Sequence, residues 1–187
     1  MSETFDVAVI GAGCAGLCAA IQAGRAGAET VLIEKNGICG GTLTMCGINY
    51  PGIFNAWGKQ VIGGIGWELV RKTLEETGAE IPNFSKEEMT CHWQHQIRTN
   101  PVVFAALADQ ALLDAGVSIR FHTMPGGIVR DGGLWKLTLC GKDGLYDLFA
   151  RVVIDCSGDA NAVKMAGYAV NQPESCPSGR ASCWGRV

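Results

Sequence analysis

The feature that most constrains the fold is a glycine-rich hexapeptide, Gly11-Ala-Gly-Cys-Ala-Gly16, that separates an apolar run from an alanine-rich segment. Residues 5–10 (FDVAVI) are apolar and rich in strand-favouring residues, whereas residues 17–26 favour a helix. Residues 28–33 return to a strand pattern and complete a β-α-β unit. The sequence therefore predicts an α/β fold that contains a parallel sheet.

The hexapeptide also has the spacing of a dinucleotide site, since Gly11, Gly13 and Gly16 match G-x-G-x-x-G between a strand and a helix. The first glycine permits a tight turn, the second lets a pyrophosphate approach the backbone, and the third lets helix and strand pack closely. Glu34 follows the second strand, where a carboxylate accepts hydrogen bonds from ribose hydroxyls and repels a 2′-phosphate. The alternative is a glycine-rich turn with a structural role only.

The rest of the chain departs from a simple series of β-α units. Asn100 followed by Pro101 has the pattern of a helix start, and two turn signals separate three short β-like runs that form a meander. The expected elements are a loop at 36–51, a helix at 57–77, a connector or insertion at 78–99, a helix at 100–115, a strand at 117–122, meander runs at 127–130, 134–140 and 146–150, a strand at 152–156 and a short helix ending near 166.

Composition narrows the functional class of this chain of 187 residues. The net charge is −3, and no basic cluster is longer than Arg71-Lys72, so the charge pattern of a nucleic-acid-binding protein is missing. The N-terminal MSETFD lacks the features of a signal peptide, and no window approaches the roughly 20 apolar residues of a membrane-spanning helix. The nine cysteines are interpreted as reduced, buried thiols, which predicts a cytoplasmic protein without nucleic-acid or membrane partners.

These motifs resemble those of flavoproteins with a glutathione-reductase-like FAD domain, and more closely those of FAD-dependent oxidoreductases related to the fumarate reductase flavoprotein class. The resemblance covers about residues 4–170 and includes the fingerprint with Glu34, Gly40-Gly41-Thr42, and Asp155-Cys-Ser-Gly-Asp159. It implies a Rossmann-like FAD-binding domain over residues 1–170 with a central parallel sheet, helices and a three-stranded meander, and FAD as the cofactor.

The resemblance also implies which residues are neighbours of FAD. The adenine edge is usually held by backbone near the start of the meander, here around Met124, although the next residue, Pro125, has no N–H to donate. The remaining implied neighbours are Gly11, Gly13, Cys14, Ala15, Gly16, Glu34, Lys35, Gly40, Gly41, Thr42, Ser157, Gly158 and Asp159.

The stretch at residues 39–52 (CGGTLTMCGINYPG) raises the question of a redox dithiol. A flavin disulfide reductase would place its cysteines at the positions of Leu43 and Ile48, so Cys39 and Cys46 have the wrong spacing, and Cys46 is expected to be a small buried apolar residue. Asn49 has an amide able to bond a flavin carbonyl or ring nitrogen, but a turn fixed by Asn, Pro and Gly is an equally open interpretation.

Other motifs are interpreted as structural. The segment 91–95 (CHWQH) offers three metal-ligating side chains without a fourth, so a surface segment is favoured and no metal site is predicted. Gly58-Lys59 fails as a phosphate-binding loop because the glycine spacing is wrong and Gln60 replaces Ser or Thr. The glycines at 63–66 are expected inside a helix, where they allow close packing, and His122 is expected on a strand in the core or at an edge.

Family members are generally longer and carry a substrate domain and a further flavin-contacting segment, neither of which fits into residues 171–187. That stretch is therefore expected to be an irregular, poorly ordered tail, and the chain to be a fragment that lacks the substrate domain. The leading hypothesis is the FAD-binding portion of an oxidoreductase that transfers hydride or electrons through FAD to or from a small-molecule substrate. The alternatives are a binding-only dinucleotide module and an NAD-binding dehydrogenase domain; catalytic residues stay unassigned.

Overall fold

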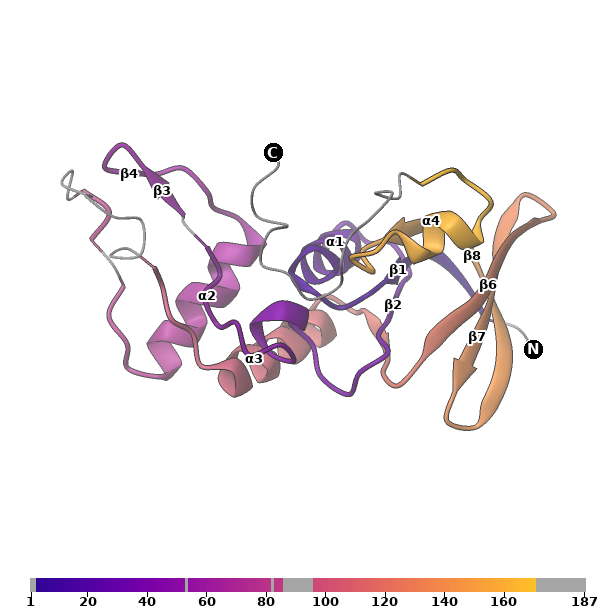
Figure 1. Cartoon of the computed structure of the whole chain (residues 1–187), viewed down its shortest axis with the longest axis horizontal. Helices are drawn as coiled ribbons and strands as arrows, with labels where there is room; N and C mark the ends of the chain where they lie inside the picture. Colours follow the sequence, from indigo (N-terminus) through magenta and orange to yellow (C-terminus); the bar gives the residue numbers. More distant parts are fainter. Residues whose placement is uncertain (1–2, 53, 82, 86–95, 171–187) are drawn as a thin grey trace, which may run out of the picture.

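The computed structural model describes residues 3–52, 54–81, 83–85 and 96–170 and contains a six-stranded sheet with the order β5-β2-β1-β8-β7-β6 (Figure 1). The first four strands in this order run parallel, and the last three form an antiparallel meander. The strands are β1 (Glu3–Ile10), β2 (Thr30–Ile33), β5 (Ser118–Arg120), β6 (Met124–Asp131), β7 (Leu134–Gly141) and β8 (Gly144–Asp155). The predicted α/β fold with a parallel sheet and a three-stranded meander is confirmed.

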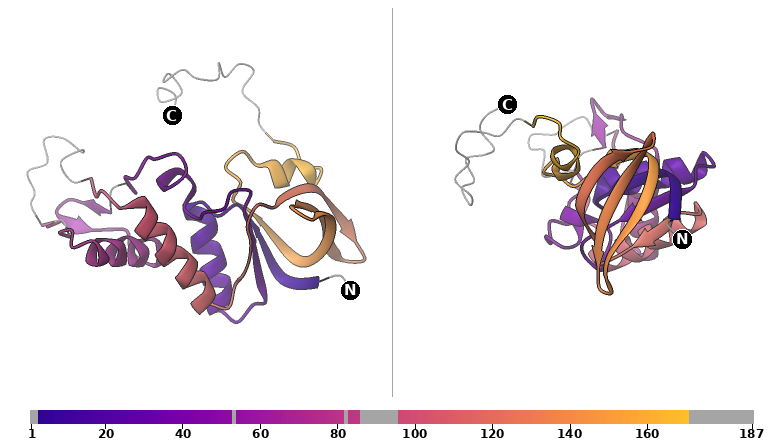
Figure 2. Two further views of the ribbon diagram at one scale, coloured as in Figure 1. Left: turned by 90° about the horizontal axis from the view of Figure 1, so that it is seen from below. Right: turned by 90° about the vertical axis from the view of Figure 1, so that its right-hand side faces the viewer.

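Two hydrophobic cores lie on opposite faces of this sheet. Along β2, Leu32 belongs to one core, whereas its neighbours Val31 and Ile33 belong to the other, as the alternation of side chains along a strand requires. The first core contains apolar residues of α1 (Cys14–Arg25), α2 (Ile65–Glu76) and α3 (Pro101–Asp114). The second contains residues of the meander and of α4 (Asn161–Met165), and Figure 2 shows the meander and α4 at the end of the molecule away from α2.

Helix α3 begins where the sequence predicts it. The Asn100 side-chain oxygen accepts hydrogen bonds from the backbone N–H groups of Val102 at 3.0 Å and Val103 at 3.2 Å. Pro101 occupies the first turn, where its missing N–H leaves no hydrogen bond unmade. The predicted helix start is therefore confirmed, and its cap is a side chain.

The predicted helix at 57–77 is wrong in its first part. Residues there form a short antiparallel hairpin of β3 (Asn55–Ala56) and β4 (Lys59–Gln60), and α2 begins only at Ile65. The physical reason is backbone conformation, since Trp57, Gly58 and Gly64 have φ angles of 50°, 67° and 78°, which an α-helix does not accommodate. Of the glycines at 63–66, only Gly66 lies within the helix, where a Cβ would contact the Cys18 sulfur at 3.7 Å.

Two further predictions need correction. The last meander run and the late strand form the single strand β8, in which Arg151 lies between two paired residues, Ala150 and Val152, and its side chain forms an ion pair with Asp6. His122 lies in a bend between β5 and β6 and is exposed, with a φ of 52°. A Cβ on Gly37 would lie only 2.7 Å from the His122 imidazole, so this side chain packs against the loop that follows β2.

The carboxyl ends of three parallel strands meet at one edge of the sheet. Gly11 N donates to the Ile33 carbonyl at 2.8 Å, and Cys156 N donates to the Ile10 carbonyl at 2.8 Å. These bonds extend the pairing of β1 with β2 and β8 by one residue and bring together the turns that follow the three strands. Because ligands of open α/β sheets bind outside the carboxyl ends of strands, this edge is the candidate site.

Some expectations fall outside the described residues. The 91–95 segment and the tail at 171–187 belong to this group, as does part of the predicted connector at 78–99. Within the described ranges, no three His, Cys, Asp or Glu residues cluster closely enough to hold a metal ion. No helix in those same ranges has the length and apolar character needed to cross a membrane.

Candidate functional site

The three glycines of the fingerprint differ in what a side chain at each position would contact. Gly11 has a φ of 96°, and a Cβ there would lie 2.5 Å from the Cys156 carbonyl oxygen. A Cβ on Gly16 would lie 1.8 Å from the Gly11 carbonyl oxygen, so any side chain would push α1 away from the turn. A Cβ on Gly13, by contrast, would meet nothing within 4 Å. Gly11 and Gly16 are therefore required by the fold, whereas Gly13 leaves an open approach to the backbone.

Helix α1 begins directly behind this open position. Gly13 is its N-cap and provides no side-chain hydrogen bond, and Cys14 and Ala15 in the first turn are exposed. The first N–H groups of a helix have no partner within it, and the helix dipole places partial positive charge at the same end. The start of α1 is therefore suited to an anionic group such as a phosphate.

The Glu34 carboxylate is buried at the end of β2 and is held by three hydrogen bonds. One oxygen accepts from Ala12 N at 2.7 Å, and the other accepts from Asn36 N at 2.8 Å and Asn36 Nδ2 at 2.7 Å. A carboxylate offers about four acceptor positions, so at least one remains for a ligand hydroxyl. Sequence reasoning predicted Glu34 but missed Asn36, whose position two residues after the acid is the local signal.

A second glycine loop packs against the fingerprint. Gly40 N donates to the Ala12 carbonyl at 2.8 Å, and a Cβ on Gly41 would lie 3.0 Å from the Gly13 Cα. Both glycines have positive φ angles, 106° at Gly40 and 54° at Gly41, and the short helix η1 (Gly41–Leu43) follows. Thr42 within η1 is exposed. The structure therefore brings Gly40, Gly41 and Thr42 to the same edge as Gly13.

The cysteines at either side of this loop differ in environment. Cys39 is fully buried, and its pKa is raised by burial and by the neighbouring carboxyl of Asp109. Cys46 is exposed, which corrects the expectation of a buried residue, since a turn closed by Gly47 N on the Thr44 carbonyl at 3.2 Å presents it to solvent. Burial also raises the pKa of Cys14. A raised pKa disfavours the reactive thiolate at Cys39 and Cys14.

Asn49 holds its loop to the segment that precedes α3. Its Nδ2 donates to the Thr99 carbonyl at 2.8 Å, and its own carbonyl accepts from Thr99 N at 3.0 Å and Thr99 Oγ1 at 3.2 Å. The amide nitrogen thus has a protein partner 50 residues away. This connection has no local sequence signal, which is why only the Asn-Pro-Gly pattern was visible.

The turn after β8 forms the third side of the site. Asp155 accepts hydrogen bonds from Ser157 N and Val163 N, both at 2.9 Å. Burial alone would raise the pKa of Asp155, but the hydrogen bonds from Ser157, Val163 and Ala162 outweigh it and hold the pKa below its ordinary value. Gly158, with a φ of 89°, and Asp159 are exposed.

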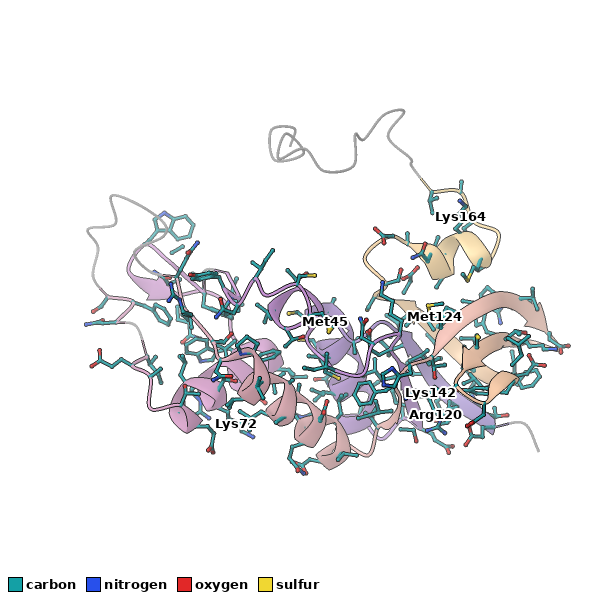
Figure 3. The ribbon with its side chains drawn as sticks, turned by 60° about the horizontal axis from the view of Figure 1, so that its bottom comes forward. Met45, Lys72, Arg120, Met124, Lys142 and Lys164 are labelled. Atoms are coloured by element: carbon teal, nitrogen blue, oxygen red, sulfur yellow. The ribbon has the colours of Figure 1, made fainter. Side chains whose placement is uncertain are left out.

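Two predicted neighbours lie farther along the edge. Lys35 is exposed immediately after Glu34, and Met124 is exposed at the first position of β6. Thr123 N donates to the Glu34 carbonyl at 3.0 Å, which ties the start of β6 to the acid. Figure 3 shows Met124 to the right of Met45, which follows the second glycine loop.

A cavity of about 150 Å³ opens beside the start of α1. Apart from Cys14 and Cys18, its lining is apolar and comes from α1, η1, α2, α3 and the loop between η1 and β3. The lining residues are Cys14, Leu17, Cys18, Leu43, Pro51, Phe54, Gly66, Leu69, Val70 and Phe104. Sequence reasoning missed this cavity because no single segment contributes most of its wall.

Comparison with known proteins identifies relatives of this chain. The model of the family described as FAD dependent oxidoreductase matches residues 6–176. A thioredoxin reductase of Peptoclostridium litorale is 38% identical over 82 residues, which are 43% of this chain and 24% of that protein.

Solved structures share the fold at low sequence identity. BexE, studied for oxidation during BE-7585A biosynthesis, has a TM-score of 0.61 and 22% identity, over 92% of this chain and 35% of its own. The anhydrotetracycline hydroxylase OxyS of Streptomyces rimosus has a TM-score of 0.57 and 16% identity, over 84% of this chain and 32% of its own. THI4 of Thermovibrio ammonificans has a TM-score of 0.56 and 17% identity, over 87% of this chain and 61% of its own. The chain thus spans about a quarter of the thioredoxin reductase and about a third of BexE and of OxyS.

Proposed function

This chain belongs to the FAD dependent oxidoreductase family, and from that premise we propose that it forms the FAD-binding portion of an enzyme that transfers hydride or electrons through the flavin. The observation that carries the proposal is the open face of Gly13 at the start of α1, beside the buried Glu34 carboxylate. A dinucleotide needs both features, one for its pyrophosphate and one for a ribose.

The residues at the strand ends fit this cofactor in charge and shape. The start of α1 would hold the pyrophosphate, with Gly13, Cys14 and Ala15 nearest to it. Glu34 would orient the adenosine ribose through its remaining acceptor position. The full proposed contact set is Gly11, Gly13, Cys14, Ala15, Gly16, Glu34, Lys35, Gly40, Gly41, Thr42, Asn49, Met124, Ser157, Gly158 and Asp159.

When bound, FAD supplies the redox chemistry, accepting and returning hydride or single electrons. The chain supplies binding and orientation. The second glycine loop and the turn after β8 flank the fingerprint, so they would fix the cofactor at the edge of the sheet. Asn49 enters the contact set through its loop, because its amide nitrogen already donates to the Thr99 carbonyl.

We further propose that residues 1–170 form the FAD-binding domain and that 78–99 is a connector or an insertion. Cytoplasmic location is proposed because the cysteines of the described segments carry free thiols, as a reducing compartment favours. The substrate is proposed to be a small molecule. A binding-only module is the second candidate function, since the open Gly13 position and the Glu34 carboxylate both serve binding.

The test begins with the visible absorption spectrum of the purified chain, recorded before and after heat denaturation. Release of a yellow flavin that is identified as FAD supports the proposal. A colourless protein that binds NADH but not added FAD would instead support the NAD-binding dehydrogenase domain. Reduction of bound flavin by an electron donor distinguishes an oxidoreductase from a binding-only module.

Substitution of two glycines, one inside and one outside the proposed site, tests whether FAD binds at Gly13. Gly13→Ala meets no protein atom within 4 Å and has an ordinary φ of −70°, so we expect it to fold and to bind FAD at least about tenfold more weakly. Gly63→Ala is the matched control, since it is also unobstructed but lies before α2, and it should bind FAD like the unchanged protein. Equal affinity in both variants would remove Gly13 from the site.

A further inference from the structure

Arg98 is an exposed cation whose position is fixed by a tyrosine. Its Nη2 donates to the Tyr50 hydroxyl at 2.7 Å, and its Cζ lies 5.3 Å from the centre of the Tyr50 ring. None of the carboxylates in the described segments forms an ion pair with it. A guanidinium has five N–H donors in a planar fork, and within the described segments the bond to Tyr50 uses one of them, so the others are open to an anionic ligand.

The backbone around Arg98 is anchored from both sides. Ile97 and Thr99 are each only 2% exposed, and Thr99 makes all three hydrogen bonds to Asn49. The next residue, Asn100, caps α3, whose N-terminus adds partial positive charge close to Arg98. The backbone of Arg98 is therefore held in place by its neighbours. Both the N-terminus of α3 and the guanidinium favour an anion.

A chain of contacts leads from this pair to the proposed cofactor site. Gly41 packs against Gly13, and the carbonyl of Thr42 accepts from Ile48 N at 3.1 Å. Tyr50 follows two residues later on the same loop. Tyr50 thus lies on the loop that follows the second glycine loop, and Arg98 contacts it from the segment before α3.

The same loop carries exposed apolar side chains. Met45 is 54% exposed and Ile48 is 55% exposed, so both side chains are accessible to a ligand. A ligand with an apolar body and one carboxylate would match these apolar side chains together with the guanidinium that contacts Tyr50 on the same loop.

We propose that Arg98 and Tyr50 bind the carboxylate group of the enzyme's substrate, and that Met45 and Ile48 contact its apolar remainder. The inference rests on the proposed function, because it names the substrate class of that oxidoreductase. Arg98 provides charge-assisted hydrogen bonds through its fork, and Tyr50 holds the fork in position. The substrate class is therefore an apolar carboxylic acid.

The experiment titrates the full chain, loaded with FAD, with benzoate by isothermal calorimetry. Benzamide is the neutral probe of the same shape, and acetate is the carboxylate without an apolar body. We expect saturable binding of benzoate, with benzamide and acetate each at least tenfold weaker. Arg98→Gln should weaken benzoate at least tenfold, Arg98→Lys less, and Tyr50→Phe about threefold, with FAD affinity unchanged in all three.

Arg130→Gln is the matched control, because Arg130 is another exposed arginine that stacks on an aromatic ring, with its Cζ 4.3 Å from the centre of Trp135 on the meander. It should bind benzoate like the unchanged protein. Equal binding of benzoate and benzamide, absence of benzoate binding, or unchanged binding in Arg98→Gln would each overturn the inference. A separate titration with FAD alone keeps the two proposals distinguishable: failure to bind FAD contradicts the proposed function, whereas FAD binding without benzoate binding overturns the inference and leaves the proposed function standing.

Discussion

At the scale of single residues, Glu34 joins three parts of the site. Its carboxylate receives Ala12 N from the glycine turn and both nitrogens of Asn36 from the next loop, and its carbonyl receives Thr123 N from the start of β6. Glu34 is 6% exposed and Ala12 is fully buried, so Ala12 N has little access to water if the Glu34 carboxylate is removed. Glu34 is therefore a structural residue of the edge as well as a proposed ligand contact.

Glu34→Ala should lower the free energy of unfolding even without FAD. A buried donor left without a partner costs about 1–3 kcal/mol, and Ala12 N would be such a donor, so we expect a loss of about 2 kcal/mol. Urea denaturation of the protein without FAD measures this change. Glu34→Gln keeps an acceptor oxygen and should lose less; equal stability of Glu34→Ala and the unchanged protein would contradict the structural role.

Residue-level prediction from the sequence succeeded where the chemistry is local. The spacing of Gly11, Gly13 and Gly16 predicted a turn between strand and helix, and the structure shows it. The contacts of Asn49 with Thr99 and of Tyr50 with Arg98 could not be predicted, since partners about 50 residues apart leave no periodic signal.

At the scale of elements, the end of β8 and the start of α4 depend on one carboxylate. Asp155 accepts from Ser157 N in the turn and from Val163 N in α4, a helix of only five residues. So short a helix has little stability of its own, and its position depends on contacts with the sheet. Asp155 therefore connects a strand end, a turn and a helix.

The lowered pKa of Asp155 predicts how this connection responds to acid. A carboxyl group with a folded-state pKa below its ordinary value stabilises the fold above about pH 4, and this contribution is lost as the pH falls through the lowered pKa. Asp155→Asn should therefore be less stable than the unchanged protein at pH 7, and the difference should shrink below about pH 4. Urea midpoints measured from pH 7 to pH 2.5 give this difference, and a gap that stays constant with pH would argue against it.

Element boundaries were predicted well where a cap or a glycine turn marks them, as at Asn100 and Gly11. The hairpin before α2 was missed because the apolar pattern of residues 57–77 does not reveal the positive φ angles of Trp57 and Gly58. The single strand β8 was divided in the prediction because Arg151 interrupts the apolar run, although the residues on either side of it pair with β1 and its side chain forms an ion pair with Asp6.

At the scale of the whole molecule, the proposed cofactor site is made by three turns that belong to one sheet edge. A ligand that binds the folded state alone stabilises it by mass action, by about 2.7 kcal/mol at a concentration of 100 times its Kd. For a chain of this size, that corresponds to a rise in Tm of roughly 5–11 °C. FAD should therefore raise the Tm of the unchanged protein, as measured by differential scanning calorimetry.

Two controls make the shift specific. Gly13→Ala should show a much smaller rise at the same FAD concentration, and NADP should give none because Glu34 repels a 2′-phosphate. An equal rise with FAD in Gly13→Ala and in the unchanged protein would count against binding at the fingerprint.

The pairing of β1 with β8 has a consequence for the order of events during synthesis. Glu3 pairs with Leu148 and Ile10 with Asp155, so β1 has to wait until about 140 further residues have been synthesised before the ladder between the two strands can close. The Gly11 turn packs on the Cys156 carbonyl, which arrives with that late strand. Capture of the cofactor therefore has to wait until β8 has been synthesised, and until then the free edge of β1 is a site for pairing with other nascent chains.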